Sequence, residues 1–201
     1  LAMSPARAID QAQLEESADQ VIALIEAEGV KALALPGDIR DEVWNATMVA
    51  RTLEAFGGLD ILVVNAGRQQ FREDVRQVST EDFDATMKTN IYAPFWVTRA
   101  ALPHMDAGAS IIITSSVQAF SGSAHLFDYA QTKAANRAFA QALAKQLADA
   151  GAQALITHPA HLRPVTEVAE ELGLARVLVT APSWSADADE KQLALAAEVT
   201  G

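Results

Sequence analysis

The stretch that decides the fold begins with S-I-I-I-T-S-S-V-Q-A-F (Ser110–Phe120) and continues into F-D-Y-A-Q-T-K (Phe127–Lys133). Its continuous apolar run, Ile111–Ile113, is typical of a strand buried on both faces of a parallel sheet. Such a strand presents Ser116 just beyond its carboxyl end, where open α/β sheets place their chemistry. After Asp128, apolar residues recur at spacings of three and four, which predicts a long helix.

The chemistry of this stretch is carried by Ser116, Tyr129 and Lys133. Tyr129 and Lys133 are four residues apart, so they share one helix face one turn apart. A tyrosine has an unperturbed pKa of about 10, and a neighbouring ammonium group together with a helix N-terminus favours its phenolate form. A serine hydroxyl can hold a bound carbonyl or alcohol against the tyrosine. An isolated Y-x-x-x-K is usually an ordinary surface pair, but a preceding buried strand that ends in T-S-S favours a site.

Four further segments extend the pattern: L-P-G-D-I-R (Leu35–Arg40), V-N-A-G (Val64–Gly67), R-Q-Q-F (Arg68–Phe71) and K-T-N-I-Y-A around Asn90. With these segments the chain resembles the short-chain dehydrogenases/reductases. The R-Q-Q-F that follows V-N-A-G is similar to a bacterial, stress-associated subgroup of that family. The other matching motifs are I-T-S-S-V-Q-A around Ser116 and Y-A-Q-T-K (Tyr129–Lys133).

This resemblance implies an oxidoreductase that uses NAD or NADP and interconverts a carbonyl and a secondary alcohol. Tyr129 would be the general acid/base, Lys133 its partner and a ribose contact, Ser116 the substrate orienter, and Asn90 the support of a proton relay. The residues that it implies for cofactor binding are Asp38, Ile39, Asn65, Ala66, Gly67, Tyr129 and Lys133. The substrate would be a small carbonyl or alcohol compound.

Alternating strands and helices along the chain predict an α/β fold, a Rossmann-like, doubly wound parallel sheet with helices on both faces. We expect one domain over residues 1–201, with a family-like core at 1–152 and a divergent substrate lid and C-terminal region at 153–201. The predicted strands are Lys31–Leu35, Ile61–Val64, Ile111–Ile113, Ala154–Thr157 and Arg176–Thr180. The predicted helices are Gln11–Glu28, Asp41–Phe56, Ser79–Ala101, the long helix after Asp128, Val165–Leu172 and Asp189–Val199.

Pro94 lies inside the predicted helix Ser79–Ala101. Because proline has no N–H, the main-chain carbonyl of Asn90, four residues earlier, loses its helical partner. A freed carbonyl beside an active site can anchor a water molecule, which agrees with the role that the resemblance implies for Asn90. A proline kink that serves packing alone is the alternative.

Composition excludes several classes of protein. The formal charge of −11 over 201 residues argues against a nucleic-acid partner. Cysteine is absent, so neither disulfides nor thiolate chemistry is available. No apolar run reaches the ~20 residues of a membrane helix and no signal peptide is apparent, so we expect a cytoplasmic protein with no membrane partner. His158 and His161 flank a proline without nearby carboxylates, and we assign no metal.

The two ends of the chain depart from the family pattern. The family's opening strand and glycine-rich turn, which seat the pyrophosphate on a helix N-terminus, have no counterpart before Ala18. We therefore expect an N-terminally incomplete Rossmann unit that binds NAD(P) weakly or not at all. A less favoured interpretation is that R-V-L-V-T-A-P-S-W-S (Arg176–Ser185) replaces the opening strand and turn.

Two functions remain open from the sequence. One is the dehydrogenase described above, and the other is a non-catalytic or truncated relative that has an assembly role and binds no dinucleotide. The helices that follow Val78 and Phe127 carry small and apolar residues over more than one stripe, which is typical of helices covered on two sides. The family uses the matching pair in a contact between subunits, so we expect a homodimer or homotetramer.

Overall fold

The computed structural model describes residues 11–147, 153–157 and 177–180. Short 3-10 turns at Val75–Gln77, Leu102–His104 and Val117–Ala119 connect the main elements. The helices are α1 (Gln11–Ala27), α2 (Glu42–Phe56), α3 (Thr80–Met87), α4 (Ala93–Ala101) and α5 (Phe127–Leu147). The strands are β1 (Ile61–Val64), β2 (Ser110–Thr114), β3 (Gln153–Thr157) and β4 (Val177–Thr180).

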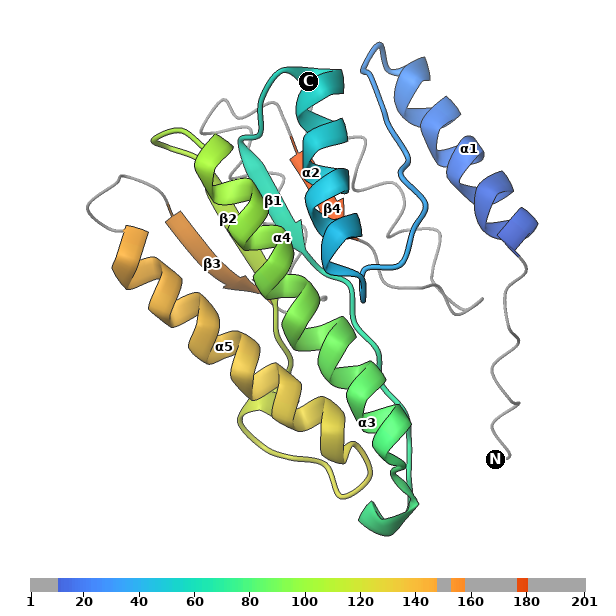
Figure 1. Cartoon of the computed structure of the whole chain (residues 1–201), viewed down its shortest axis with the longest axis vertical. Coiled ribbons are helices and arrows are strands. Elements are labelled where there is room, and N and C mark those ends of the chain that lie inside the picture. Colours follow the sequence, from blue (N-terminus) through green and yellow to red (C-terminus); the bar gives the residue numbers. More distant parts are fainter. Residues whose placement is uncertain (1–10, 148–152, 158–176, 181–201) are drawn as a thin grey trace.

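The four described strands form one parallel sheet in the order β3-β2-β1-β4. The chain moves outward from β1 through β2 to β3 and then returns to add β4 on the other side of β1 (Figure 1). Val64 is in register with Ile113 on one side and with Thr180 on the other. Such a reversal of strand order defines a doubly wound sheet, and ligands bind outside the carboxyl ends of its strands at that point. The predicted fold class is confirmed.

The core lies between the sheet and the helices α2, α4 and α5 (Figure 1). All four residues of β1 are buried, as are Ile111–Thr114 of β2, which explains why both strands are apolar. Helix α4 packs on β1, and α5 packs on β2 and β3. The predicted helices Val165–Leu172 and Asp189–Val199 lie outside the described residues.

The two ends of helix α2 are set by capping residues, an aspartate before its first turn and a glycine after its last. The Asp41 carboxylate accepts a hydrogen bond from the main-chain N–H of Val43 at 2.8 Å, which caps the first turn. Gly57 ends the helix in the left-handed region at φ 77°, a conformation that other residues adopt at a cost. Upstream, a side-chain carbon at Gly37 would lie 2.0 Å from the Trp44 ring, so only glycine fits there.

The prediction of a strand at Lys31–Leu35 was wrong. This segment is irregular and pairs with no strand in the described part of the chain. Leu35 packs against the core, but Leu33 is 40 % exposed, whereas a parallel strand needs apolar cover on both faces. Both edges of β1 are already taken by β2 and β4, so the segment gains no place beside the central strand.

The predicted helix Ser79–Ala101 is continuous but changes its geometry in the middle. Between α3 and α4, Lys88–Tyr92 form a π-helical turn, and the N–H of Ala93 donates to the carbonyl of Lys88, five residues earlier. The turn lies directly before Pro94, which cannot make the usual bond to the carbonyl of Asn90. Such turns are frequent at functional sites.

Candidate active site at the carboxyl edge of the sheet

Lys133 is a buried cation at the carboxyl edge of the sheet. It stands on the second turn of α5, is 3 % exposed, and its Nζ donates to the main-chain carbonyl of Thr114 at 2.9 Å. Burial lowers the pKa of Lys133 from 10.5 to about 8. Its Nζ lies 5.5 Å from the centre of the Tyr129 ring. The predicted pair is therefore together, and the main chain at the end of β2 holds its ammonium group.

Asn90 is fully buried in the π-helical turn and joins three segments of the chain. Its Oδ1 accepts from the main-chain N–H of Arg68 at 2.7 Å, and its Nδ2 donates to the carbonyl of Arg68 at 2.8 Å. The same Nδ2 donates to the Thr132 hydroxyl on α5 at 2.9 Å. Asn90 thus connects the chain after β1 with the helix that carries Tyr129 and Lys133.

Asn65, Ala66 and Gly67 follow directly after β1, as predicted. The Asn65 Oδ1 accepts from the Thr114 hydroxyl at 2.8 Å, so its amide braces the end of the neighbouring strand. Gly67 faces the two central polar groups, because a side-chain carbon built on it would lie 3.5 Å from the Lys133 Nζ and 3.8 Å from the Asn90 Oδ1. The loop therefore forms one wall of the site.

Ser116 lies two residues beyond Thr114 at the carboxyl end of β2. Its Oγ accepts from the main-chain N–H of Gln118 at 3.2 Å, which caps the short turn Val117–Ala119. Ser116 and Tyr129 are both partly exposed, in contrast to buried Lys133 and Asn90. The two hydroxyl groups expected to meet the substrate are thus the accessible ones.

Asp38 and Ile39 lie apart from this cluster, in the loop before α2. The Asp38 carboxylate is paired with Arg40 at 2.7 Å, and hydrogen bonds from the Arg40 guanidinium are the main reason that the pKa of Asp38 is lowered. The carbonyl of Ile39 accepts from the Asn45 amide at 2.7 Å. In the described part of the chain, no hydrogen bond joins Asp38 to the other predicted site residues.

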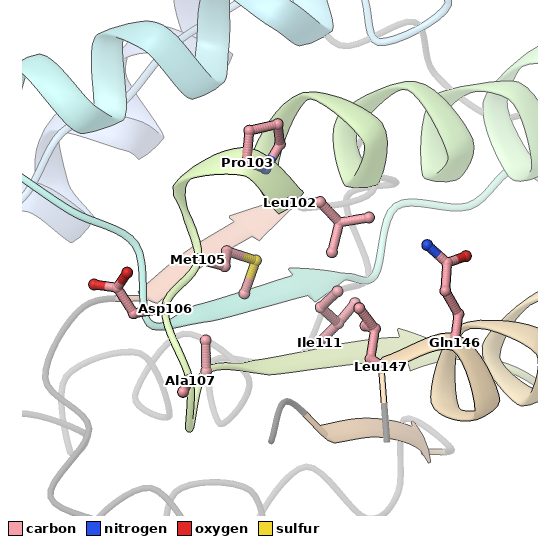
Figure 2. Close-up of a pocket in the computed structure, with 9 residues that line it drawn as sticks. Leu102, Pro103, Met105, Asp106, Ala107, Ile111, Gln146 and Leu147 are labelled. Atoms are coloured by element: carbon pink, nitrogen blue, oxygen red, sulfur yellow. The ribbon is translucent and has the colours of Figure 1, made fainter. Parts of the chain in front are cut away.

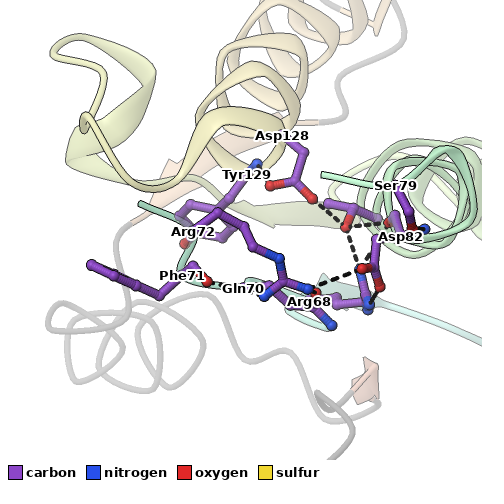
Figure 3. A network of polar contacts seen from close by, with 9 residues as sticks. Arg68, Gln70, Phe71, Arg72, Ser79, Asp82, Asp128 and Tyr129 are labelled. Carbon is purple, nitrogen blue, oxygen red and sulfur yellow. Dashed lines mark hydrogen bonds and ion pairs between the residues drawn. The ribbon is translucent and has the colours of Figure 1, made fainter. Parts of the chain in front are cut away.

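Sequence reasoning missed a polar network beside Tyr129 (Figure 3). It links the loop after β1 to α3 and α5 through Arg68, Arg72, Asp82, Thr86 and Asp128. Its contacts join residues that are 10 to 42 positions apart in the chain, so no local spacing signals them. A charged residue directly before Tyr129 was the only sequence clue.

A cavity of about 350 Å³ lies at the other end of β2 (Figure 2). Its lining is mainly apolar and includes Leu102, Met105, Ile111 and Leu147. Ile111 is the second residue of β2, so this cavity is near the amino edge of the sheet, away from Lys133 and Tyr129. It brings no catalytic side chains together and is not the candidate active site.

Among the described residues, no group of His, Cys, Asp and Glu side chains is arranged to hold a metal ion, and His158 and His161 lie outside the described part of the chain. No described helix has the length and apolar character that crossing a membrane requires.

A doubly wound parallel sheet with a Tyr–Lys pair and a buried asparagine at its carboxyl edge defines a Rossmann-type α/β protein with a cluster of polar side chains at that edge. Comparison with known proteins makes the assignment specific. The family model described as short chain dehydrogenase matches residues 1–176. The chain belongs to the short-chain dehydrogenase/reductase family.

Individual relatives agree with this assignment. The chain is 44 % identical over 145 residues to the uncharacterized oxidoreductase YghA of Escherichia coli, covering 72 % of this chain and 49 % of that protein. It is 38 % identical over 136 residues to general stress protein 39 of Bacillus subtilis, covering 68 % of this chain and 48 % of that protein. The predicted likeness to stress-associated members is confirmed. The chain spans about half the length of these relatives.

A solved structure supports the fold. A short-chain dehydrogenase from Burkholderia cenocepacia, crystallised in complex with NADP, matches with a TM-score of 0.70 and 30 % sequence identity. The match covers 92 % of this chain and 76 % of that chain.

Proposed function

We propose that the chain carries the proton-handling residues of an NAD(P)-dependent oxidoreductase that interconverts a carbonyl and a secondary alcohol. The observation that supports this most strongly is the buried Lys133, held by the Thr114 carbonyl one helical turn from Tyr129. A surface Tyr–Lys pair would not bury its ammonium group, because taking a charge out of water costs free energy. The placement of this cation therefore favours a functional role.

In this proposal, each residue has a role that matches its surroundings. Tyr129, partly exposed, donates a proton to a carbonyl oxygen or accepts one from an alcohol. Lys133 supplies positive charge beside the tyrosine and is within reach of a ribose hydroxyl. Ser116 donates a hydrogen bond to the substrate oxygen. The carbonyl of Asn90, opposite Pro94, accepts from a water that connects Lys133 to solvent.

The described residues fit one end of a nicotinamide cofactor. Gly67 carries no side chain and faces the Lys133 Nζ, and Asn65 orders the ends of β1 and β2, so the main chain is open where a ribose would lie. NAD(P) would supply or remove the hydride, and the chain's own residues would supply the proton and the geometry. Asp38, Ile39 and the segment Asn65–Gly67 are the proposed contacts on the adenosine side of the cofactor.

The described residues offer the pyrophosphate of NAD(P) fewer favourable contacts than they offer the nicotinamide ribose. No glycine-rich turn lies at the carboxyl edge among the described residues, and the chain has a net charge of −11. Charge-assisted hydrogen bonds are worth roughly 1.5–3 kcal/mol each, so lacking several of them costs orders of magnitude in affinity. We expect titration calorimetry of the 201-residue chain to give weak or undetectable binding of NADH and NADPH. A micromolar dissociation constant would contradict this expectation.

Because we expect weak cofactor binding, the activity test uses a high concentration of cofactor. NADPH or NADH at millimolar concentration is incubated with the chain and a panel of aldehydes and ketones, and cofactor absorbance is followed against product. The reverse direction uses secondary alcohols with the oxidised cofactor. We expect stoichiometric turnover of at least one substrate class. Absence of turnover with every member of both panels would contradict the proposal and favour the non-catalytic alternative.

An assembly surface accompanies either function. Tyr92 and Phe95 are 47 % and 46 % exposed, and the Phe95 ring lies 6.5 Å from the Phe139 ring across α4 and α5. Exposed aromatic rings that meet across two helices are typical of a covered surface. We propose that this surface, formed by Tyr92, Phe95 and Phe139, is the contact of a homodimer or homotetramer.

A further inference from the structure

Thr86 lies between a cation and a carboxylate on different elements. It is fully buried in α3, and its Oγ1 is 2.6 Å from the Nη1 of Arg68 and 2.6 Å from the Oδ2 of Asp128. Arg68 belongs to the loop after β1, and Asp128 belongs to the first turn of α5. A single hydroxyl group therefore joins the two segments that flank the site.

The direction of these bonds is set by the charges. The guanidinium of Arg68 can only donate, so Thr86 accepts from it and keeps one proton to give. Two acceptors are within reach of that proton, the carbonyl of Asp82 at 2.9 Å and the carboxylate of Asp128 at 2.6 Å. The charged and nearer acceptor makes the stronger bond. Arg68 therefore donates a hydrogen bond to Thr86, and Thr86 donates one to Asp128.

Asp128 needs this bond because it is 3 % exposed. No ion pair to Asp128 exists among the described residues, and its Oδ1 accepts from the main-chain N–H of Tyr129 at 2.9 Å. A buried carboxylate without hydrogen bonds is costly, so both contacts are needed. The carboxylate thereby holds the main chain of the proposed acid/base residue.

Arg68 is itself held firmly. Its Nη2 donates to the Asp82 carboxylate at 2.6 Å, while its main-chain N–H and carbonyl are bound by Asn90. Arg72 donates to the other oxygen of the same carboxylate at 2.9 Å. Arg68, which donates the first hydrogen bond in the series Arg68–Thr86–Asp128, is thus fixed through both its main chain and its side chain.

We propose that Thr86 and Asp128 are positioning residues that couple the loop after β1 to the first turn of α5 and so fix Tyr129. The catalytic consequence rests on the proposed function, whereas the mechanical coupling does not. If Arg68 moves, the Thr86 hydroxyl transmits the movement to Asp128, whose carboxylate holds the main chain of Tyr129. Holding a catalytic group in place matters because a misplacement of ~1 Å can cost ~100-fold in rate.

The test compares three threonine variants. Thr86→Val keeps the shape of the side chain and removes the hydrogen bonds to Arg68 and Asp128, Thr86→Ser restores the hydroxyl, and Thr98→Val is the control. Thr98 is equally buried in α4, but its hydroxyl has no hydrogen-bond partner in the structure, so its loss should cost little. Asp128→Asn, which keeps the size of the side chain, replaces Thr86→Val if that variant does not fold.

The first measurement is amide hydrogen exchange of Tyr129 by NMR, which needs neither cofactor nor turnover. We expect protection to fall by about tenfold or more in Thr86→Val, since one bond worth about 1.5 kcal/mol or more is lost. Protection in Thr86→Ser and Thr98→Val should stay within about threefold of the parent. Equal protection in Thr86→Val and the parent, or equal losses in Thr86→Val and Thr98→Val, would overturn the coupling.

The second measurement applies where the parent chain turns over a substrate. We expect kcat to fall about 10- to 100-fold in Thr86→Val, with KM for the substrate changed less than about threefold, and to recover in Thr86→Ser. An unchanged kcat with altered exchange would overturn the positioning role. If the parent is inactive, the proposed function has failed, while hydrogen exchange still decides the coupling.

Discussion

Lys133 shows how a single residue links burial, charge and chemistry. Its ammonium group has one described hydrogen bond, to the Thr114 carbonyl, and little contact with solvent. Burial disfavours the charged form, which is why the pKa is lowered to about 8. Near neutral pH the group is mostly charged, yet it loses its proton more readily than a surface lysine.

This lowered pKa makes stability depend on pH. Below pH 8 Lys133 is charged in both the folded and the unfolded chain, and the folded chain bears the cost of burying the charge. Between pH 8 and 10.5 the unfolded chain binds more protons, so the free energy of unfolding rises with pH across this window. The rise attributable to Lys133 is on the order of 3 kcal/mol if the unfolded value is the ordinary one.

The measurement is urea unfolding of the parent and of Lys133→Met at pH 7 and pH 10. Because other groups titrate in both proteins, the difference between the two isolates Lys133. We expect the parent to gain stability relative to Lys133→Met at the higher pH. A difference that is constant, or that changes in the opposite direction, would contradict the assignment of a buried charge.

At the scale of the element, the helix containing Asn90 carries the main structural adaptation. Its π-helical turn, Lys88–Tyr92, places a fully buried amide against the main chain of Arg68 and the hydroxyl of Thr132. Pro94 makes the local change in geometry inexpensive because the N–H that an α-helix would need is absent anyway.

We expect Asn90→Ala to lower the free energy of unfolding by about 2–4 kcal/mol. The substitution leaves the N–H and carbonyl of Arg68 without their partner, and each buried unsatisfied group costs about 1–3 kcal/mol. The control Gln69→Ala, at an exposed position beside Arg68 in the loop after β1, should change the free energy of unfolding by less than about 0.5 kcal/mol. Equal effects of the two substitutions in denaturant titrations would show that the Asn90 contacts carry no stability.

Periodicity predicted most elements because their apolar patterns are local. The helix α2 and the strand β1 were placed within a residue of their observed bounds, and α5 lies where a long helix was predicted. Lys31–Leu35 failed because a short apolar run does not reveal whether a neighbouring strand edge is free to pair with it. Similarly, Y-x-x-x-K placed Tyr129 and Lys133 on one face, but the bonds of Thr86 join segments up to 42 residues apart. Only the folded chain reveals such contacts.

At the scale of the whole molecule, the aromatic surface of Tyr92, Phe95 and Phe139 predicts self-association. We expect light scattering at micromolar concentration to give the mass of a dimer or tetramer. Phe95→Glu should yield a monomer, because it places a charge where apolar rings would be buried. Val43→Glu on α2, at a position 72 % exposed, is the matched control and should leave the mass unchanged. A monomeric parent would remove this proposal.

The acid/base role of Tyr129 is the central claim, and Tyr129→Phe tests it most directly because the substitution removes only the titrating hydroxyl. Initial rates of the parent and Tyr129→Phe are compared at millimolar NADPH or NADH on a substrate that the parent turns over. We predict a loss of about 100- to 10,000-fold, which is typical for removing a general acid/base. A variant rate close to that of the parent would show that another group transfers the proton and would contradict the account.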